Sequence, residues 1–278
     1  MESGYGRSVH PIEHLRYVAR AQGADPSSLV EETAHALGSL HFDPSALVVA
    51  CRRIVERHPF TGALWWLCAN VVTSAEPFEA VWELADAIRS DRTGAELAAV
   101  LADEATVVTI GDPDVTGDGL VRRGDVRVLA LDAGYAATSF VRRLERYDVD
   151  VEAVDAGVAG AAVRHADVVL VEALAVDSER VLVPIGSSTI AAAAAAFGRE
   201  SWIVAGVGRR LPSGFLDAMV AKVDALAEEV DPWSLDVEVL PTSMFTHVVG
   251  PHGKVPMGPP AIVAECPMAH ELLRPSHI

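Results

Sequence analysis

The residues of this sequence that are best suited to chemistry form a run of one glycine and three hydroxyl side chains. The run consists of Gly186, Ser187, Ser188 and Thr189, and it stands directly before an alanine-rich stretch that is typical of a helix. The first turn of a helix has unpaired N–H groups and the positive end of the helix dipole, and both attract phosphate. The run therefore predicts an anion site, with an ordinary helix N-cap as the alternative.

Charged residues at the ends of short apolar segments are further candidates for this site. Arg209 and Arg210 follow one such segment, and their guanidinium groups are suited to an anion. Asp132 closes another, where a carboxylate acts either as a general base or as the cap of a turn. The same two interpretations apply to Glu172 and Asp155, which lie near the ends of two more segments.

A calcium loop is imitated by the segment Asp114-Val115-Thr116-Gly117-Asp118-Gly119 together with Asp125. Oxygen-bearing residues stand at positions 1, 3, 5 and 12 and a glycine at position 6. The segment follows a predicted strand and lacks the flanking pair of helices, so we expect an Asp/Gly-rich surface turn. No metal site is predicted.

The elements that position these residues change in type near residue 105. Residues 11–104 have the apolar spacing of helices. After residue 105, short β-branched runs alternate with helical stretches, which is typical of a parallel sheet covered by helices. The runs are Thr106–Ile110, Arg127–Leu131, Val149–Val154, Val168–Val171 and Trp202–Ala205. The predicted fold class is α/β, with a helical N-terminal domain over residues 1–105 and a Rossmann-like parallel-sheet domain over residues 106–278.

Three other segments complete the predicted architecture. Between Val171 and Gly186 we expect a polar loop, and the tail from Gly250 is also predicted to be a loop. Trp65 and Trp66 stand in an apolar run, which favours a place in the core or at an interface.

Composition and charge exclude several classes of function. The formal net charge of −17 argues against direct nucleic-acid binding, because phosphate backbones require a basic surface. No basic-then-apolar leader opens the chain, and no apolar run is long enough to span a membrane. The three cysteines lack metal-ligand spacing and suit a reducing compartment. These features predict a soluble cytoplasmic protein without a cofactor.

Several motifs are similar to those of one protein superfamily. Val171-Glu172-Ala173-Leu174 stands where that superfamily has a VGAD or VGAE turn, and Val183–Ser187 stands where it has an NKIGT loop. Asp236–Thr246 is similar to its closing FDVTPPELVTAII segment, with weaker matches at Asp155–Val163 and at Gly134-Tyr135. The chain thus resembles the alpha, beta and delta regulatory subunits of translation initiation factor 2B. The same superfamily holds the methylthioribose-1-phosphate and ribose-1,5-bisphosphate isomerases.

The resemblance implies aldose–ketose isomerisation of a sugar 1-phosphate, with a cysteine and an aspartate as the acid–base pair. In this chain Asp132, or Ala133-Gly134 one register further, stands at the place of the cysteine, and Leu174 stands at the place of the aspartate. Leucine carries no proton, so the usual mechanism is expected to be lost. The leading hypothesis is a non-isomerising protein that binds a phosphorylated sugar or nucleotide. The alternatives are an active enzyme that uses Asp132 and a structural subunit of a complex.

The resemblance also implies a ligand site and an assembly. The ligand-binding residues it predicts, together with the positions discussed above, are Gly134, Asp155, Glu172, Gly186, Ser187, Ser188, Thr189, Arg209 and Arg210. Members of the superfamily pair through the C-terminal domain, so we expect a homodimer. The apolar segments Val237–Leu240 and Met244–Val249 suit its interface.

Overall fold

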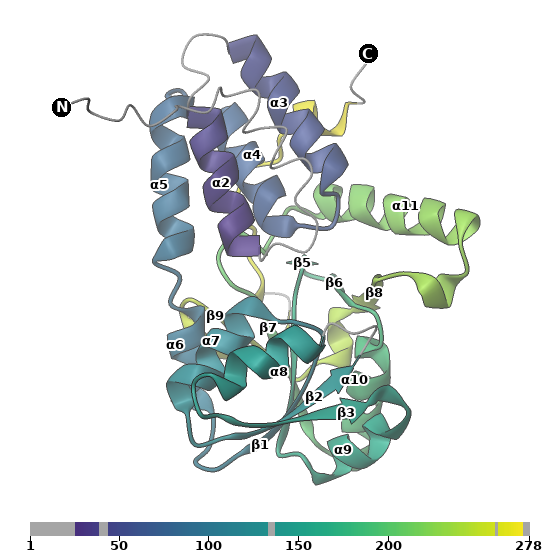
Figure 1. Cartoon of the computed structure of the whole chain (residues 1–278). Coiled ribbons are helices and arrows are strands. Elements are labelled where there is room, and N and C mark those ends of the chain that lie inside the picture. Colours follow the sequence, from purple (N-terminus) through teal and green to yellow (C-terminus); the bar gives the residue numbers. More distant parts are fainter. Residues whose placement is uncertain (1–25, 39–43, 133–136, 259–260, 275–278) are drawn as a thin grey trace, which may run out of the picture.

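The computed structural model describes residues 26–38, 44–132, 137–258 and 261–274. Two layers of structure are visible in Figure 1, a helical part above and an α/β part below. The first part follows the sequence prediction, because its described residues up to Val100 form successive helices. These are α2 (Pro26–Gly38), α3 (Pro44–Arg57), α4 (Gly62–Thr73), α5 (Pro77–Arg89) and α6 (Thr93–Val100).

The centre of the helical part is α4. It is apolar on all sides, and most of its residues are buried, which is typical of a helix surrounded by other elements. Trp65 and Trp66 are buried as predicted, and their indole N–H groups donate to the carbonyl oxygens of Pro59 and Glu265. Each tryptophan therefore combines apolar burial with a satisfied donor.

The main sheet has seven strands, in the order β10-β9-β7-β4-β1-β2-β3. All neighbours are parallel except β10, which runs antiparallel to β9. The predicted α/β class and all five predicted strands are confirmed. The strands are β1 (Thr106–Ile110), β2 (Arg127–Asp132), β3 (Asp150–Asp155), β4 (Val168–Glu172), β7 (Glu200–Val204), β9 (His247–Gly250) and β10 (Gly253–Pro256).

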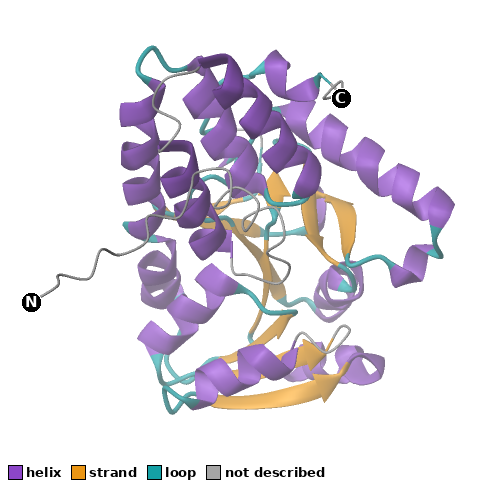
Figure 2. Ribbon diagram, turned by 45° about the horizontal axis from the view of Figure 1, so that its top comes forward, coloured by secondary structure: helices purple, strands orange, loops and turns teal. Residues whose placement is uncertain are grey.

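Helices cover both faces of this sheet (Figure 2). On one face Ile190 of α10 (Ser187–Phe197) and Val163 of α9 (Ala159–His165) belong to one buried cluster. On the other face Leu120 of α7 (Asp114–Arg123) and Phe140 of α8 (Ala137–Glu145) belong to a second. The α6 helix lies against α7, so it packs with the sheet although it precedes residue 105. The domain division near that residue stays a prediction.

A second, three-stranded sheet stands where the sequence predicted a polar loop. The prediction of a loop was wrong, because Val181, Leu182 and Val183 are fully buried and pair with neighbouring strands. The strands are antiparallel, in the order β5-β6-β8, with bounds β5 (Ala175–Val176), β6 (Arg180–Pro184) and β8 (Val237–Pro241).

Two further expectations need correction. The Asp/Gly-rich segment from Asp114 is not a surface turn but helix α7, whose glycines make close contacts. At Gly119 an added Cβ would lie 2.8 Å from the Leu97 side chain, so α6 and α7 need a small residue there. The segment 250–260, predicted as a loop, contains strand β10, and the short 3₁₀ helix η5 (His270–Leu273) lies further along the chain.

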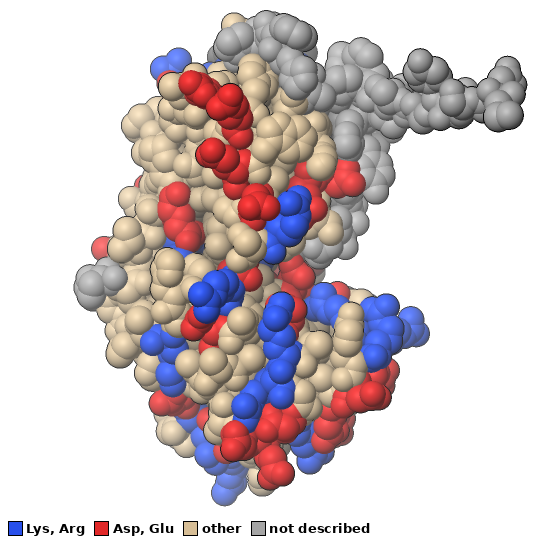
Figure 3. Space-filling model, turned by 90° about the vertical axis from the view of Figure 1, so that its left-hand side faces the viewer, with Lys and Arg blue, Asp and Glu red and all other residues tan. Residues whose placement is uncertain are grey.

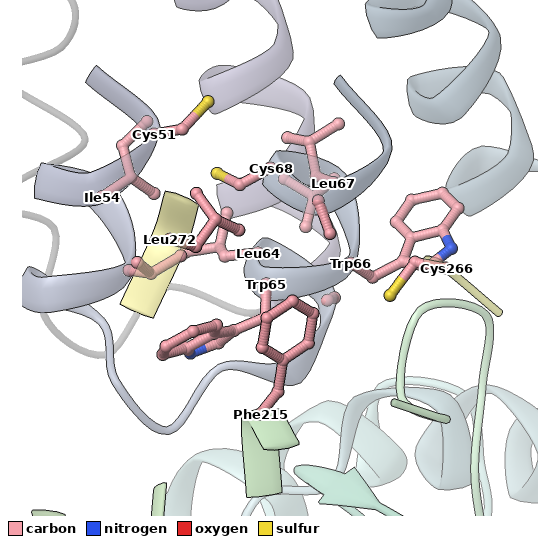
Figure 4. Packing of buried hydrophobic residues seen from close by; sticks show 14 of the residues in the cluster. Cys51, Ile54, Leu64, Trp65, Trp66, Leu67, Cys68, Phe215, Cys266 and Leu272 are labelled. Carbon is pink, nitrogen blue, oxygen red and sulfur yellow. The ribbon is translucent and has the colours of Figure 1, made fainter. Parts of the chain in front are cut away.

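The chain returns to the helical part through α11 (Ser213–Glu229) and through its C-terminal segment. Figure 4 shows Phe215 of α11 beside Trp65, with ring centroids 5.1 Å apart, and Leu272 near Leu64. The buried core of the helical part thus contains residues from both ends of the sequence. Among the described helices, none has both the length and the apolar character needed to cross a membrane.

Candidate functional site

The candidate site lies at the carboxyl edge of the main sheet. The strand order reverses between β1 and β4, and such switch points are where open α/β sheets bind ligands. The start of α10 reaches this edge, because a Cβ on Gly186 would lie 2.9 Å from the Cδ1 atom of Ile110. Gly186 has a φ of 89°, a left-handed conformation that favours glycine. The predicted Gly186–Thr189 run therefore does begin a helix at the expected edge.

A carboxylate of the chain itself binds the first turn of α10. The backbone N–H of Ser188 donates a hydrogen bond of 2.9 Å to Oε1 of Glu238, which comes from β8. The Ser187 hydroxyl donates to the Pro184 carbonyl oxygen at 2.6 Å, and the Thr189 N–H donates to that of Gly186 at 3.1 Å. Negative charge is thus present at this helix terminus, and its source is a glutamate.

The N-terminus of α7 is bound in the same way. Glu172 accepts hydrogen bonds from the N–H groups of Thr116 at 2.8 Å and Asp114 at 3.3 Å. Its side chain is only 5% exposed and forms an ion pair of 3.2 Å with Arg209, which is 4% exposed. Arg209 also donates to the Ala173 carbonyl oxygen at 2.6 Å. Glu172 and Arg209 were both predicted to bind a ligand, and the structure places them in contact with each other.

Arg210 and the loop before it are held by a second set of carboxylates. Arg210 forms an ion pair with Glu265, which also accepts from the Gly208 N–H at 2.8 Å. The neighbouring Val207 N–H donates to Asp91 at 2.9 Å. Sequence analysis missed Asp91 and Glu265, since each is more than fifty residues from the loop and no local pattern marks it.

Asp132 lies apart from these pairs, at the end of β2. Its register partner across the sheet is Asp155, which is exposed and accepts a hydrogen bond of 2.7 Å from the Gly157 N–H. The Oδ1 atom of Asp132 is buried and has no hydrogen-bond partner among the residues that the structure describes. The predicted binding residue Gly134 lies outside the described residues.

Leu174 lies at a contact between the helical part and the small sheet. Its N–H donates to the Leu182 carbonyl oxygen at 2.9 Å, and its own carbonyl oxygen accepts from the Gly62 N–H at 3.0 Å. The Leu174 side chain packs against the core of the helical part. An apolar contact between the two parts therefore occupies the place where the resemblance requires an acid.

No metal site emerges from the residues that the structure describes, since they contain no group of three His, Cys, Asp or Glu side chains placed to hold an ion.

Basic side chains gather over the α/β part on the face shown in Figure 3, interspersed with acids. Among the arginines of the α/β part, Arg143 of α8 has two acids close to it, because it lies 3.1 Å from Asp112 and 4.0 Å from Asp114.

The fold of this chain is similar to that of several solved structures. No family model matches the chain, and no curated protein matches it by sequence. Among solved structures, translation initiation factor eIF-2B of Pyrococcus horikoshii OT3 aligns with a TM-score of 0.75 at 16% identity, over 91% of this chain and 98% of that one. The chain has the fold of the eIF2B subunits.

Two fungal proteins support the same assignment of the fold. The eIF2B delta subunit of Chaetomium thermophilum aligns with a TM-score of 0.63 at 18% identity, over 88% of this chain and 98% of that one. The tetrameric eIF2B-beta2-delta2 complex of C. thermophilum gives a TM-score of 0.65 at 15% identity, over 90% of this chain and 91% of the matched chain. The resemblance predicted from the sequence is thus confirmed for the eIF2B-like fold.

Proposed function

We propose that this chain is a non-catalytic structural component of a protein assembly, built on the eIF2B-like fold. The observation that carries the proposal is the use of the chain's own carboxylates. Glu238 binds the first turn of α10, Glu172 binds that of α7, and Glu265 holds Arg210. These N–H and guanidinium groups are the donors that a phosphate would need, and here they stabilise the fold.

The residues around Leu174 support the loss of isomerase chemistry. An acid–base mechanism needs a second proton-carrying group within hydrogen-bond reach of the substrate. Leu174 carries none, and its carbonyl oxygen is bound to Gly62 of the helical part. The solved structure of an eIF2B complex with the same fold is a tetramer, which supports a role in assembly for this chain.

A second candidate is a protein that binds a phosphorylated sugar or nucleotide without isomerising it. The buried Asp132 oxygen at the carboxyl edge lacks a hydrogen-bond partner among the described residues. It favours this candidate, because it would accept a hydrogen bond from a sugar hydroxyl. For a phosphate to bind at Ser188, the Glu238 carboxylate must first leave the N–H group. The cost of that displacement favours the structural role.

Thermal unfolding separates the two candidates. The structural role predicts no shift in melting temperature with inorganic phosphate, ribose 1,5-bisphosphate or AMP. The binding role predicts stabilisation that grows with ligand concentration and disappears in Ser188→Asp, where a carboxylate replaces the phosphate. An assay of the same purified protein with ribose 1,5-bisphosphate and with methylthioribose 1-phosphate tests catalysis. Turnover of about 1 per second or more would establish an active enzyme with Asp132 as the candidate base and overturn both proposals.

A further inference from the structure

An arm projects from the body of this fold. The arm consists of α11 and the segment after it, residues 213–236, and Figure 1 shows the helix extending away from the body of the molecule. The residues of α11 that are buried are Phe215, Leu216, Met219 and Val223. They all lie in the first eleven residues of the helix, so only that part is anchored to the core. Most of residues 224–234 are exposed, and the chain is anchored again at Leu235, which packs against the core of the helical part.

Two large apolar side chains are exposed at the tip of this arm. Trp233 is 78% exposed and Val230 is 46% exposed, and the residues between them are exposed as well. Tryptophan is the side chain that contributes most often to binding energy at interfaces, and clustered exposed apolar side chains mark interaction sites. In η2 (Pro232–Ser234) a proline precedes Trp233, which limits the conformations of the segment that presents the ring.

The negative charge of the arm favours a positively charged partner. Residues 213–236 contain six acids and a single base, Lys222. Asp217 pairs with Arg180, whereas the acids near the tip form no ion pair with any described residue. These acids are Asp224, Glu228, Glu229, Asp231 and Asp236. An exposed aromatic side chain on a segment with several uncompensated carboxylates suits arginine or lysine, through cation–π contact and ion pairing together.

We propose that the tip of this arm, residues 224–236, is a docking surface for an arginine- or lysine-rich segment of a protein partner. The inference deepens the proposed structural role and rests on it, because a component of an assembly needs a surface that selects its partner. Failure of this inference can be distinguished from failure of the proposed structural role, because absence of peptide binding would leave the results on turnover and phosphate binding unchanged. A nucleic acid is excluded as the occupant by the negative charge of the arm.

The test uses two labelled peptides and the full-length protein. The basic probe has four Arg-Gly-Leu repeats, the acidic probe has four Glu-Gly-Leu repeats, and binding is followed by fluorescence anisotropy at physiological salt. We expect the wild type to bind the basic probe only, and Trp233→Ala to weaken binding at least about tenfold. The matched control is Phe197→Ala, which removes an aromatic ring that is 44% exposed on α10, and it should bind as the wild type does.

A charge variant distinguishes the arm from the net charge of the protein. The double variant Glu228→Gln with Glu229→Gln should weaken binding and reduce its dependence on salt. Equal binding by Trp233→Ala and the wild type would overturn the proposal, because it would show attraction by net charge alone. Absence of binding to either probe would also overturn it. Self-association of the wild type that Trp233→Ala abolishes would identify a second copy as the occupant instead.

Discussion

The carboxylate of Glu238 lies 2.9 Å from the backbone nitrogen of Ser188, at the start of the helix where a phosphate was expected. The glutamate belongs to an edge strand of the small sheet and the serine to α10, so this hydrogen bond joins the sheet to the helix. One N–H group of the predicted anion site therefore already has a carboxylate of the chain as its acceptor.

Removing the Glu238 carboxylate should uncover the site. Glu238→Ala is expected to lower the free energy of unfolding by about 1 kcal/mol, the usual contribution of a helix cap, as measured by urea denaturation. Phosphate should then stabilise this variant more than it stabilises the wild type. Glu238→Gln keeps an acceptor and serves as the control, with a smaller loss. If Glu238→Ala is as stable as the wild type, the contact contributes nothing to the fold.

Gly62 is predicted to be irreplaceable at the contact between the two parts. A Cβ at this position would lie 2.3 Å from the Leu174 carbonyl oxygen, a distance that no relaxed structure tolerates. Gly62→Ala should therefore cost about 2 kcal/mol or more of unfolding free energy. Gly160→Ala is the matched control, because a Cβ there meets nothing within 4 Å and alanine favours the helix. Similar stability of the two variants would contradict this account.

Among the ion pairs of the described residues, the buried pair of Glu172 and Arg209 should be the most sensitive to mutation. Arg209→Ala leaves the Glu172 carboxylate buried without its partner and should cost about 3–5 kcal/mol. The exposed pair of Arg92 and Glu96 provides the comparison, and Arg92→Ala should change stability by about 0.5 kcal/mol or less. Chemical denaturation of both variants measures the difference. A small effect of Arg209→Ala would show that water reaches the pair.

Stability should fall at alkaline pH in part because of Cys266. Burial raises the pKa of its thiol from 9.0 to about 12, and the nearby Glu265 carboxylate adds to the shift. The unfolded chain therefore loses the thiol proton at lower pH than the folded chain does. The stabilisation is complete below pH 9.0 and is lost as the pH rises through the folded pKa of about 12.

A cysteine variant isolates this contribution. Between about pH 8 and about pH 10, the wild type should lose roughly 1 kcal/mol more unfolding free energy than Cys266→Ala does. Urea denaturation at the two pH values measures the difference. Parallel pH profiles for the two proteins would show that the thiol does not titrate differently on unfolding.

The predicted homodimer is tested by light scattering of the purified protein at micromolar concentration. Of the two segments expected at its interface, Met244–Val249 contains most of β9, which is paired with β7 on one side and β10 on the other. The segment Val237–Leu240 belongs to β8, which pairs with β6 at one edge and ends the small sheet at the other. Backbone groups at such an edge are available to a second chain. A monomeric mass would refute the homodimer.

The sequence alone was sufficient for five strands of the main sheet and for the start of α10. Val168–Val171 and Thr106–Ile110 predict buried strands because a β-branched apolar run has few other stable conformations. The start of α10 was predictable for the same kind of reason, since a glycine followed by hydroxyl residues and alanines is a local signal. The small sheet was missed because its strands are short and one of its partners is distant in sequence.

Only the tertiary structure decided what the candidate site contains. Glu238 lies fifty residues from Ser188, and Glu265 lies fifty-five residues from Arg210. Side chains so far apart meet only when the sheets and helices pack, and no local pattern records which acid reaches which donor. Local sequence thus provided the helix N-termini and the arginines, whose individual chemistry favours an anion. Packing determined that the anions would be the chain's own carboxylates, because a buried donor is costly unless some acceptor lies within hydrogen-bond distance.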